Sequence, residues 1–115
     1  MTVGFSVWRP LTVAETVAAP ETPGVFEIAN LVRTLLFVGT APESLAASLT
    51  QYLDVPGRRQ PSFGRLHFRF LPTNEPERVQ DDLLLSYRER HGGALPPAQT
   101  SQPPAIRPTR HLKAV

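Results

Sequence analysis

Few residues in this chain have side chains that do chemistry, and their spacing assembles no reactive set. The three histidines, His67, His91 and His111, stand too far apart in sequence to form a metal-ligand motif. Asp81 and Asp82 are adjacent, but neighbours on a helix point to different faces, so we interpret them as complementing a helix dipole. The chain has no cysteine, no glycine-rich phosphate loop and no nucleophile elbow. The sequence therefore predicts no metal site and no cofactor.

The basic residues form the remaining candidate site. The chain has 12 Lys+Arg against 10 Asp+Glu, a net charge of +2, so it is not polybasic. One group of cations nevertheless falls in a single loop and on the strand after it, with an aromatic residue that could stack on a base; its members are Arg58, Arg59, Phe63, Arg65, His67 and Arg69. We interpret this group as a surface for nucleic acid, as a surface for an acidic protein partner, or as a solvated sheet face balanced by nearby acids.

Apolar patterning predicts the sheet that must position these residues. Residues 25–28 and 35–38 are apolar enough to be the central strands of an antiparallel hairpin. Asn30 suits the turn between them because asparagine tolerates left-handed backbone angles. Leu31 and Val32 would then be exposed near the tip, where they could contact a partner. Residues 65–71 alternate apolar and polar side chains and predict a third strand with one solvated face.

Capping and breaking residues place three helices. Thr12 with Glu15 forms a capping box before a short helix over residues 13–18. Pro42 suits the first turn of a second helix, which spans residues 42–54. Asn74 and Glu77 form another capping box before a long helix that Gly92 and Gly93 end.

The two ends of the chain flank this α+β domain, which we place at residues 23–93. Residues 1–22 form an arm in which Val3, Phe5 and Val7 alternate, so the small three-stranded sheet could gain an edge strand. Trp8 either anchors this arm on the domain or serves as a stacking platform for a base or for a partner protein. Residues 94–115 are rich in proline and predict an extended tail, in which the partner-contact candidates are Ile106 and Leu112.

No targeting or membrane segment is apparent in the sequence. The N-terminus lacks the features of a signal peptide, and no apolar run approaches the roughly 20 residues that span a membrane. We therefore expect a cytoplasmic protein.

The two hairpin strands resemble a known nuclease family. Gly24-Val25-Phe26 followed by Phe37-Val38-Gly39 is similar to the paired motifs of the GIY-YIG nuclease domain, found in repair-nuclease subunits and homing endonucleases. The similarity runs from about residue 23 to residue 92. It implies a three-stranded antiparallel sheet flanked by helices and, in active members, hydrolysis of DNA with one divalent metal ion.

The resemblance also implies which five positions would carry the chemistry, and this chain departs from the family at four of them. The family's two motif tyrosines correspond to Phe26 and Phe37, which have no hydroxyl. The arginine that holds the phosphate corresponds to Ser48. The glutamate that binds the metal corresponds to Gln80, with Asp81 and Asp82 one and two residues further on. Tyr52 stands where the family often has histidine or tyrosine. Losing one such group costs about 3–5 kcal/mol of transition-state stabilisation, so the resemblance implies a retained fold and lost cleavage.

These inferences predict a non-catalytic interaction or structural module on a degenerate GIY-YIG-like scaffold. It would be a small subunit that binds a partner protein through its arm, hairpin tip and tail. A nucleic-acid-binding protein that uses the arginine-rich loop and strand is the first alternative. An active metal-dependent endonuclease with relocated residues is the second.

Overall fold

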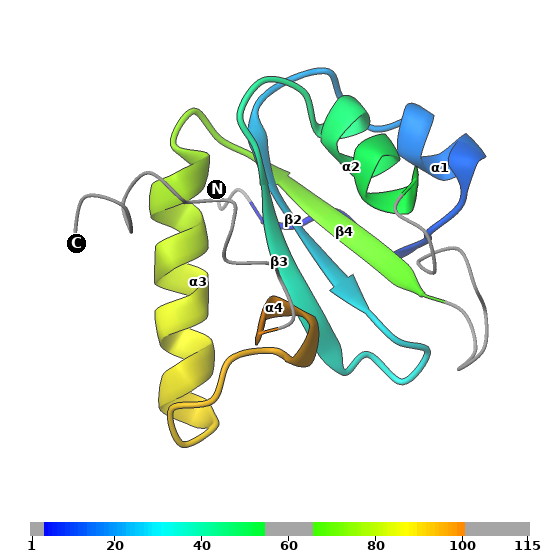
Figure 1. Ribbon diagram of the computed structural model, residues 1–115. Coiled ribbons are helices and arrows are strands. Elements are labelled where there is room, and N and C mark those ends of the chain that lie inside the picture. Colours follow the sequence, from blue (N-terminus) through cyan, green and yellow to red (C-terminus); the bar gives the residue numbers. More distant parts are fainter. Residues whose placement is uncertain (1–3, 55–65, 101–115) are drawn as a thin grey trace, which may run out of the picture.

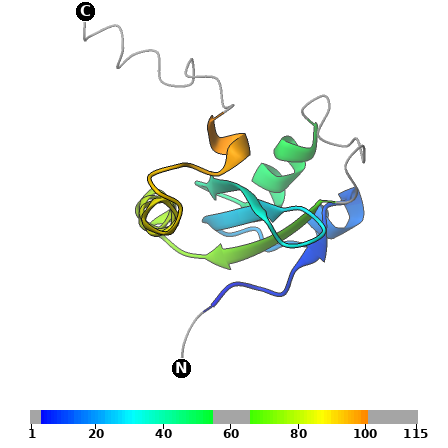
Figure 2. The same cartoon turned by 90° about the horizontal axis from the view of Figure 1, so that it is seen from below.

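The structure is a computed structural model that describes residues 4–54 and 66–100. It has the α+β architecture that the sequence predicts, with one four-stranded antiparallel sheet and helices packed around it (Figure 1). Figure 2 shows α2 and α4 on one side of the sheet and the N-terminal segment on the other. The elements are β1 (Arg9–Pro10), α1 (Val13–Val17), β2 (Gly24–Ala29), β3 (Leu35–Ala41), α2 (Leu45–Asp54), β4 (His67–Pro72), α3 (Pro76–Arg90) and α4 (Pro97–Thr100).

The sheet is organised around β2, and its strand order is β1-β4-β2-β3. All six residues of β2 are buried, because strands lie on both sides of it and both of its faces are covered. In the register Phe26 lies between Gly39 and Phe70, and Ile28 lies between Phe37 and Phe68. The predicted hairpin is confirmed, and its strands are longer than the sequence pattern indicated.

The N-terminal segment supplies the fourth strand, but not where the alternation of Val3, Phe5 and Val7 predicted it. The strand is Arg9–Pro10, paired with Phe68 and His67 of β4. Before it the Ser6 N–H donates to the Phe70 carbonyl at 2.8 Å, while Val7 is 70% exposed. Val3 lies outside the described residues.

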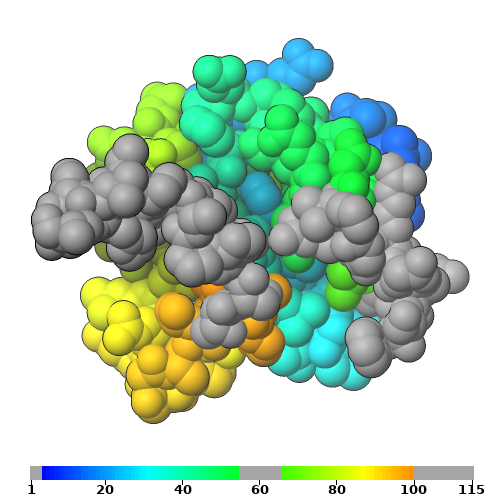
Figure 3. Space-filling model, in the orientation of Figure 1, coloured from blue at the N-terminus to red at the C-terminus, as the bar shows by residue number. Residues whose placement is uncertain are grey.

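The sequence predicts that residues 94–115 are extended, but the part of this segment that the structure describes is not extended throughout. Residues Pro97–Thr100 form α4, and Pro96 before it is fully buried. In the space-filling view α4 lies between the C-terminal half of α3 and the β2–β3 hairpin (Figure 3). Ala98 packs on the hydrophobic core, so this stretch is part of the globule.

Two predicted helix starts are wrong for local reasons. The second helix begins at Leu45 and not at Pro42, because the Leu45 N–H donates to the Thr22 carbonyl and the Ser44 hydroxyl accepts from the Ala47 N–H. The long helix begins at Pro76, so its cap is Glu75 and not Asn74. A residue before proline is disfavoured in helical geometry, and Glu75 accordingly has φ −127° and ψ 63°.

Two predicted helix ends can be compared with the structure. The Thr12 side chain caps α1 by accepting from the Glu15 N–H at 3.2 Å, but the Thr12 N–H donates to the Pro10 carbonyl, so only the first half of the predicted capping box is formed. Gly92 and Gly93 end α3 with positive φ angles of 65° and 91°. No helix in residues 4–54 and 66–100 is long and apolar enough to cross a membrane.

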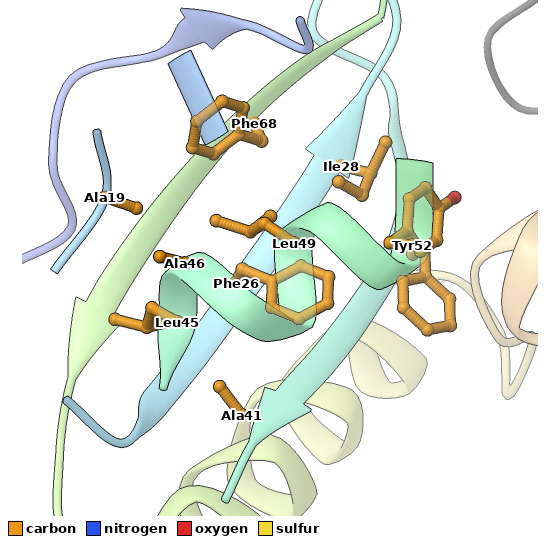
Figure 4. Packing of buried hydrophobic residues seen from close by; sticks show 10 residues of the cluster. Ala19, Phe26, Ile28, Ala41, Leu45, Ala46, Leu49, Tyr52 and Phe68 are labelled. Carbon is orange, nitrogen blue, oxygen red and sulfur yellow. The ribbon is translucent and has the colours of Figure 1, made fainter. Parts of the chain in front are cut away.

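The hydrophobic core lies between α2 and the sheet face that carries Phe26 and Ile28 (Figure 4). Leu45 and Leu49 of α2 are completely buried against this face, and Phe68 of β4 joins them. The i, i+4 spacing of the two leucines places them on one stripe of the helix. Packing against α2 therefore fixes the orientation of Phe26 and Ile28 on the hairpin.

Gly39 is required by this packing. A Cβ atom on Gly39 would come within 2.3 Å of Cζ of Phe26 and 2.7 Å of Cε2 of Phe37. The Phe26 ring therefore lies on the bare backbone of its cross-strand partner.

We expect Gly39→Ala to lower the free energy of unfolding by about 2 kcal/mol, because the added methyl must displace two packed rings. Urea denaturation measures this change. Gly4→Ala is the matched control, since no atom lies within 4 Å of its Cβ position, and it should change stability by less than about 0.5 kcal/mol. Equal midpoints for the two variants would contradict the packing argument.

Candidate functional site

Three of the five motif positions meet in one aromatic cluster. The ring centroids of Phe26 and Phe37 are 6.0 Å apart, and Tyr52 of α2 lies 6.1 Å from the first and 5.2 Å from the second. All three side chains are buried, and Figure 4 shows Phe26 and Tyr52 within the packed core. Tilted and edge-on pairs at these separations are favourable aromatic contacts. The hairpin positions that would supply hydroxyls in the resembled family are thus occupied by packed phenyl rings.

The other two motif positions have structural hydrogen bonds. The Nε2 of Gln80 on α3 donates to the Val38 carbonyl at 2.9 Å, so its amide is engaged with the second hairpin strand. Ser48 lies half-buried in α2, and its N–H donates to the Ser44 carbonyl at 3.0 Å. Within residues 4–54 and 66–100 no group of three or more His, Cys, Asp or Glu side chains could hold a metal ion.

Four of the six residues of the predicted cationic surface lie outside the described residues; these are Arg58, Arg59, Phe63 and Arg65. His67 and Arg69 lie on β4, on the sheet face opposite Phe68. The predicted solvation of this face holds only in part at Arg69, whose side chain is 33% exposed.

Arg69 is paired with a buried acid and covered by the N-terminal arm. Its Nε donates to Oε1 of Glu27, directly opposite on β2, at 2.8 Å. Glu27 is only 5% exposed. The guanidinium lies 4.4 Å from the ring centroid of Phe5 and 4.6 Å from that of Trp8. Both the ion pair and the aromatic contacts make Arg69 part of the packed structure.

Trp8 connects the arm to the hairpin as well as to β4. Besides Arg69, the guanidinium of Arg33 lies over its ring at 5.5 Å from the centroid. Both contacts hold the arm against the sheet, which agrees with the anchoring interpretation of Trp8. The predicted partner-contact residues of the tail, Ile106 and Leu112, lie outside the described residues.

The hairpin tip, residues 30–34, is tightly hydrogen-bonded. Oδ1 of Asn30 accepts from the N–H groups of Val32 at 3.0 Å and Thr34 at 2.9 Å. The left-handed residue is Arg33, with φ 69°, and not Asn30 as predicted. Asn30 is therefore important for its side-chain oxygen, which closes the turn.

The tip presents two apolar side chains to solvent, as the sequence predicted. Leu31 is 58% exposed and Val32 is 77% exposed. Arg33, the next residue in the chain, is also exposed, and its Nη1 donates to the Leu31 carbonyl at 3.2 Å. An exposed apolar pair with an adjacent cation is an arrangement suited to protein contact.

Comparison with protein-family models, with curated proteins and with solved structures finds no match of any of the three kinds.

We expect Arg69→Ala to lower the free energy of unfolding by about 3 kcal/mol, because it leaves the Glu27 carboxylate buried without its cation. Chemical denaturation followed by tryptophan fluorescence measures the loss. Arg78→Ala is the control, since the Arg78–Glu75 pair lies on an exposed helix surface, where ion pairs contribute little. If both variants unfolded at the same denaturant concentration, the buried pair would be no more important than a surface pair.

Proposed function

We propose that this chain is a non-catalytic interaction module on a GIY-YIG-like scaffold, a small subunit that binds a partner protein. The observation that carries the proposal is the mutual packing of Phe26, Phe37 and Tyr52. Phosphodiester hydrolysis needs positioned acid–base groups and a cation on the phosphate. The phenyl rings at Phe26 and Phe37 supply no acid–base group and no cation.

The arrangement of the motif positions supports the scaffold part of the proposal. Gly24–Phe26 and Phe37–Gly39 lie on adjacent antiparallel strands, with Phe26 directly opposite Gly39. Gln80 reaches Val38, in the middle of the second motif, from α3. Positions far apart in sequence thus converge on the same two strands.

The hairpin tip supports the partner-binding part. The two hydrogen bonds that Oδ1 of Asn30 accepts hold the backbone of the turn that carries Leu31 and Val32. A turn that is ordered in the free protein loses less conformational entropy when a partner binds. A left-handed arginine is a strained backbone position, and such strain is frequent at binding sites. The partner that fits offers an apolar pocket for the two side chains, with a carboxylate at its rim for Arg33.

We expect Leu31→Asp combined with Val32→Asp to abolish partner binding, because two carboxylates cannot enter an apolar pocket. Affinity capture on immobilised protein from an extract of the source cells, quantified by mass spectrometry, measures retention. The partner's recovery should fall at least about tenfold. Leu85→Asp is the matched control, since Leu85 on α3 is 56% exposed. Identical proteins retained by the tip variant and the wild type would contradict the proposal.

The non-catalytic part has its own test. Supercoiled plasmid incubated with the protein and Mg²⁺ or Mn²⁺ should remain supercoiled, as in a protein-free control. Nicking that scales with protein concentration would overturn this part and leave the binding result unaffected.

A further inference from the structure

The two edges of the sheet differ in their capacity to accept another strand. β1 has two residues, one of them Pro10, which has no N–H to donate. β3 has seven residues, Leu35–Ala41, with neither a charge nor a proline. Long, uncharged edge strands invite pairing with another chain, so natural proteins cover or charge them. The edge that needs protection here is β3.

A side chain from α4 protects the middle of this edge. The Val38 N–H donates to Oε1 of Gln99 at 2.8 Å, and Nε2 of Gln99 donates to the Val38 carbonyl at 2.9 Å. One residue of a neighbouring antiparallel strand makes the same two bonds with the residue opposite it. The carboxamide of Gln99 therefore occupies the place of a fifth strand at one position.

The two bonds at Val38 depend on Gln99 to different degrees. The carbonyl also accepts from Nε2 of Gln80, so it keeps a donor when Gln99 leaves. The N–H has its acceptor in Gln99, and Val38 is completely buried. A buried N–H without an acceptor is costly, so an uncovered β3 must find another acceptor.

We propose that Gln99 closes the β3 edge against β3 of a second copy of this chain, and that release of α4 uncovers a homodimer interface. Antiparallel pairing about a two-fold axis at Val38 lets the two valines exchange N–H and carbonyl bonds, so the edge is complementary to itself. The carbonyl lone pair that Gln99 uses becomes available to the incoming N–H, while Gln80 keeps its own bond. The lack of charge along β3 removes the repulsion that would keep two copies apart.

Size-exclusion chromatography with light scattering on the full chain, over a wide concentration range, tests the interface. Gln99→Ala and Gln99→Leu should shift from one chain to about twice that mass as concentration rises. The wild type and the control Gln80→Ala should stay at the mass of one chain under the same conditions. Variants that remain at wild-type mass throughout, or a wild type that dimerises as readily as they do, would overturn the proposal.

A second substitution locates the contact. Backbone groups of alternate residues face the same side of a strand, so the Thr40 N–H points away from β2 as that of Val38 does. Thr40→Pro added to Gln99→Ala should return the mass to one chain while circular dichroism shows an unchanged fold. A double variant that dimerises as strongly as Gln99→Ala would show that the contact is elsewhere.

Amide hydrogen exchange in the wild-type chain tests the release step without any variant. The Val38 amide should exchange faster than the amides of Phe37 and Gly39, because it opens when α4 leaves and theirs open with the sheet. Equal protection of all three amides would show that α4 does not leave separately and would overturn the proposal.

Discussion

A carboxylate in the middle of the central strand constrains the whole structure. Glu27 is enclosed by strands on both sides, and a buried charge is tolerated only with a partner. Arg69 supplies that partner from the opposite position on β4. A slip of one residue would turn Glu27 toward the apolar core, so the ion pair also fixes the register. The rings of Phe5 and Trp8 then cover the guanidinium, which holds the N-terminal arm in place.

The two faces of the sheet consequently have different roles. One face packs phenyl rings against α2, and the other carries the ion pair under the arm. Both faces of the central strand β2 are covered, and we therefore place partner contacts at the margins of the sheet. The hairpin tip is such a margin, with exposed Leu31 and Val32, and the β3 edge is another, covered at Val38 by Gln99. Both proposals concern these margins.

Local patterns predicted the strands and helices of the central domain, because burial periodicity and capping act within a few residues. They were wrong where two local signals competed. Pro76 overrode Asn74 as the start of α3, and the turn used the side chain of Asn30 while Arg33 became left-handed. The contact of Arg69 with Phe5 and Trp8 joins residues far apart in the chain, so no local sequence pattern indicated it. Gln99 is 61 residues from Val38, and no pattern of spacing indicates such a bond.

The contact between Phe26 and Gly39 also bears on how the chain could change over evolution. A hydroxyl added at Cζ of Phe26 would lie next to the backbone of Gly39, and Phe26 is only 3% exposed to solvent. Such a group must find a hydrogen-bond partner or destabilise the fold. The position of Phe26 therefore resists a single substitution to a polar side chain, and a hydroxyl could be accommodated there only if a neighbouring residue changed with it.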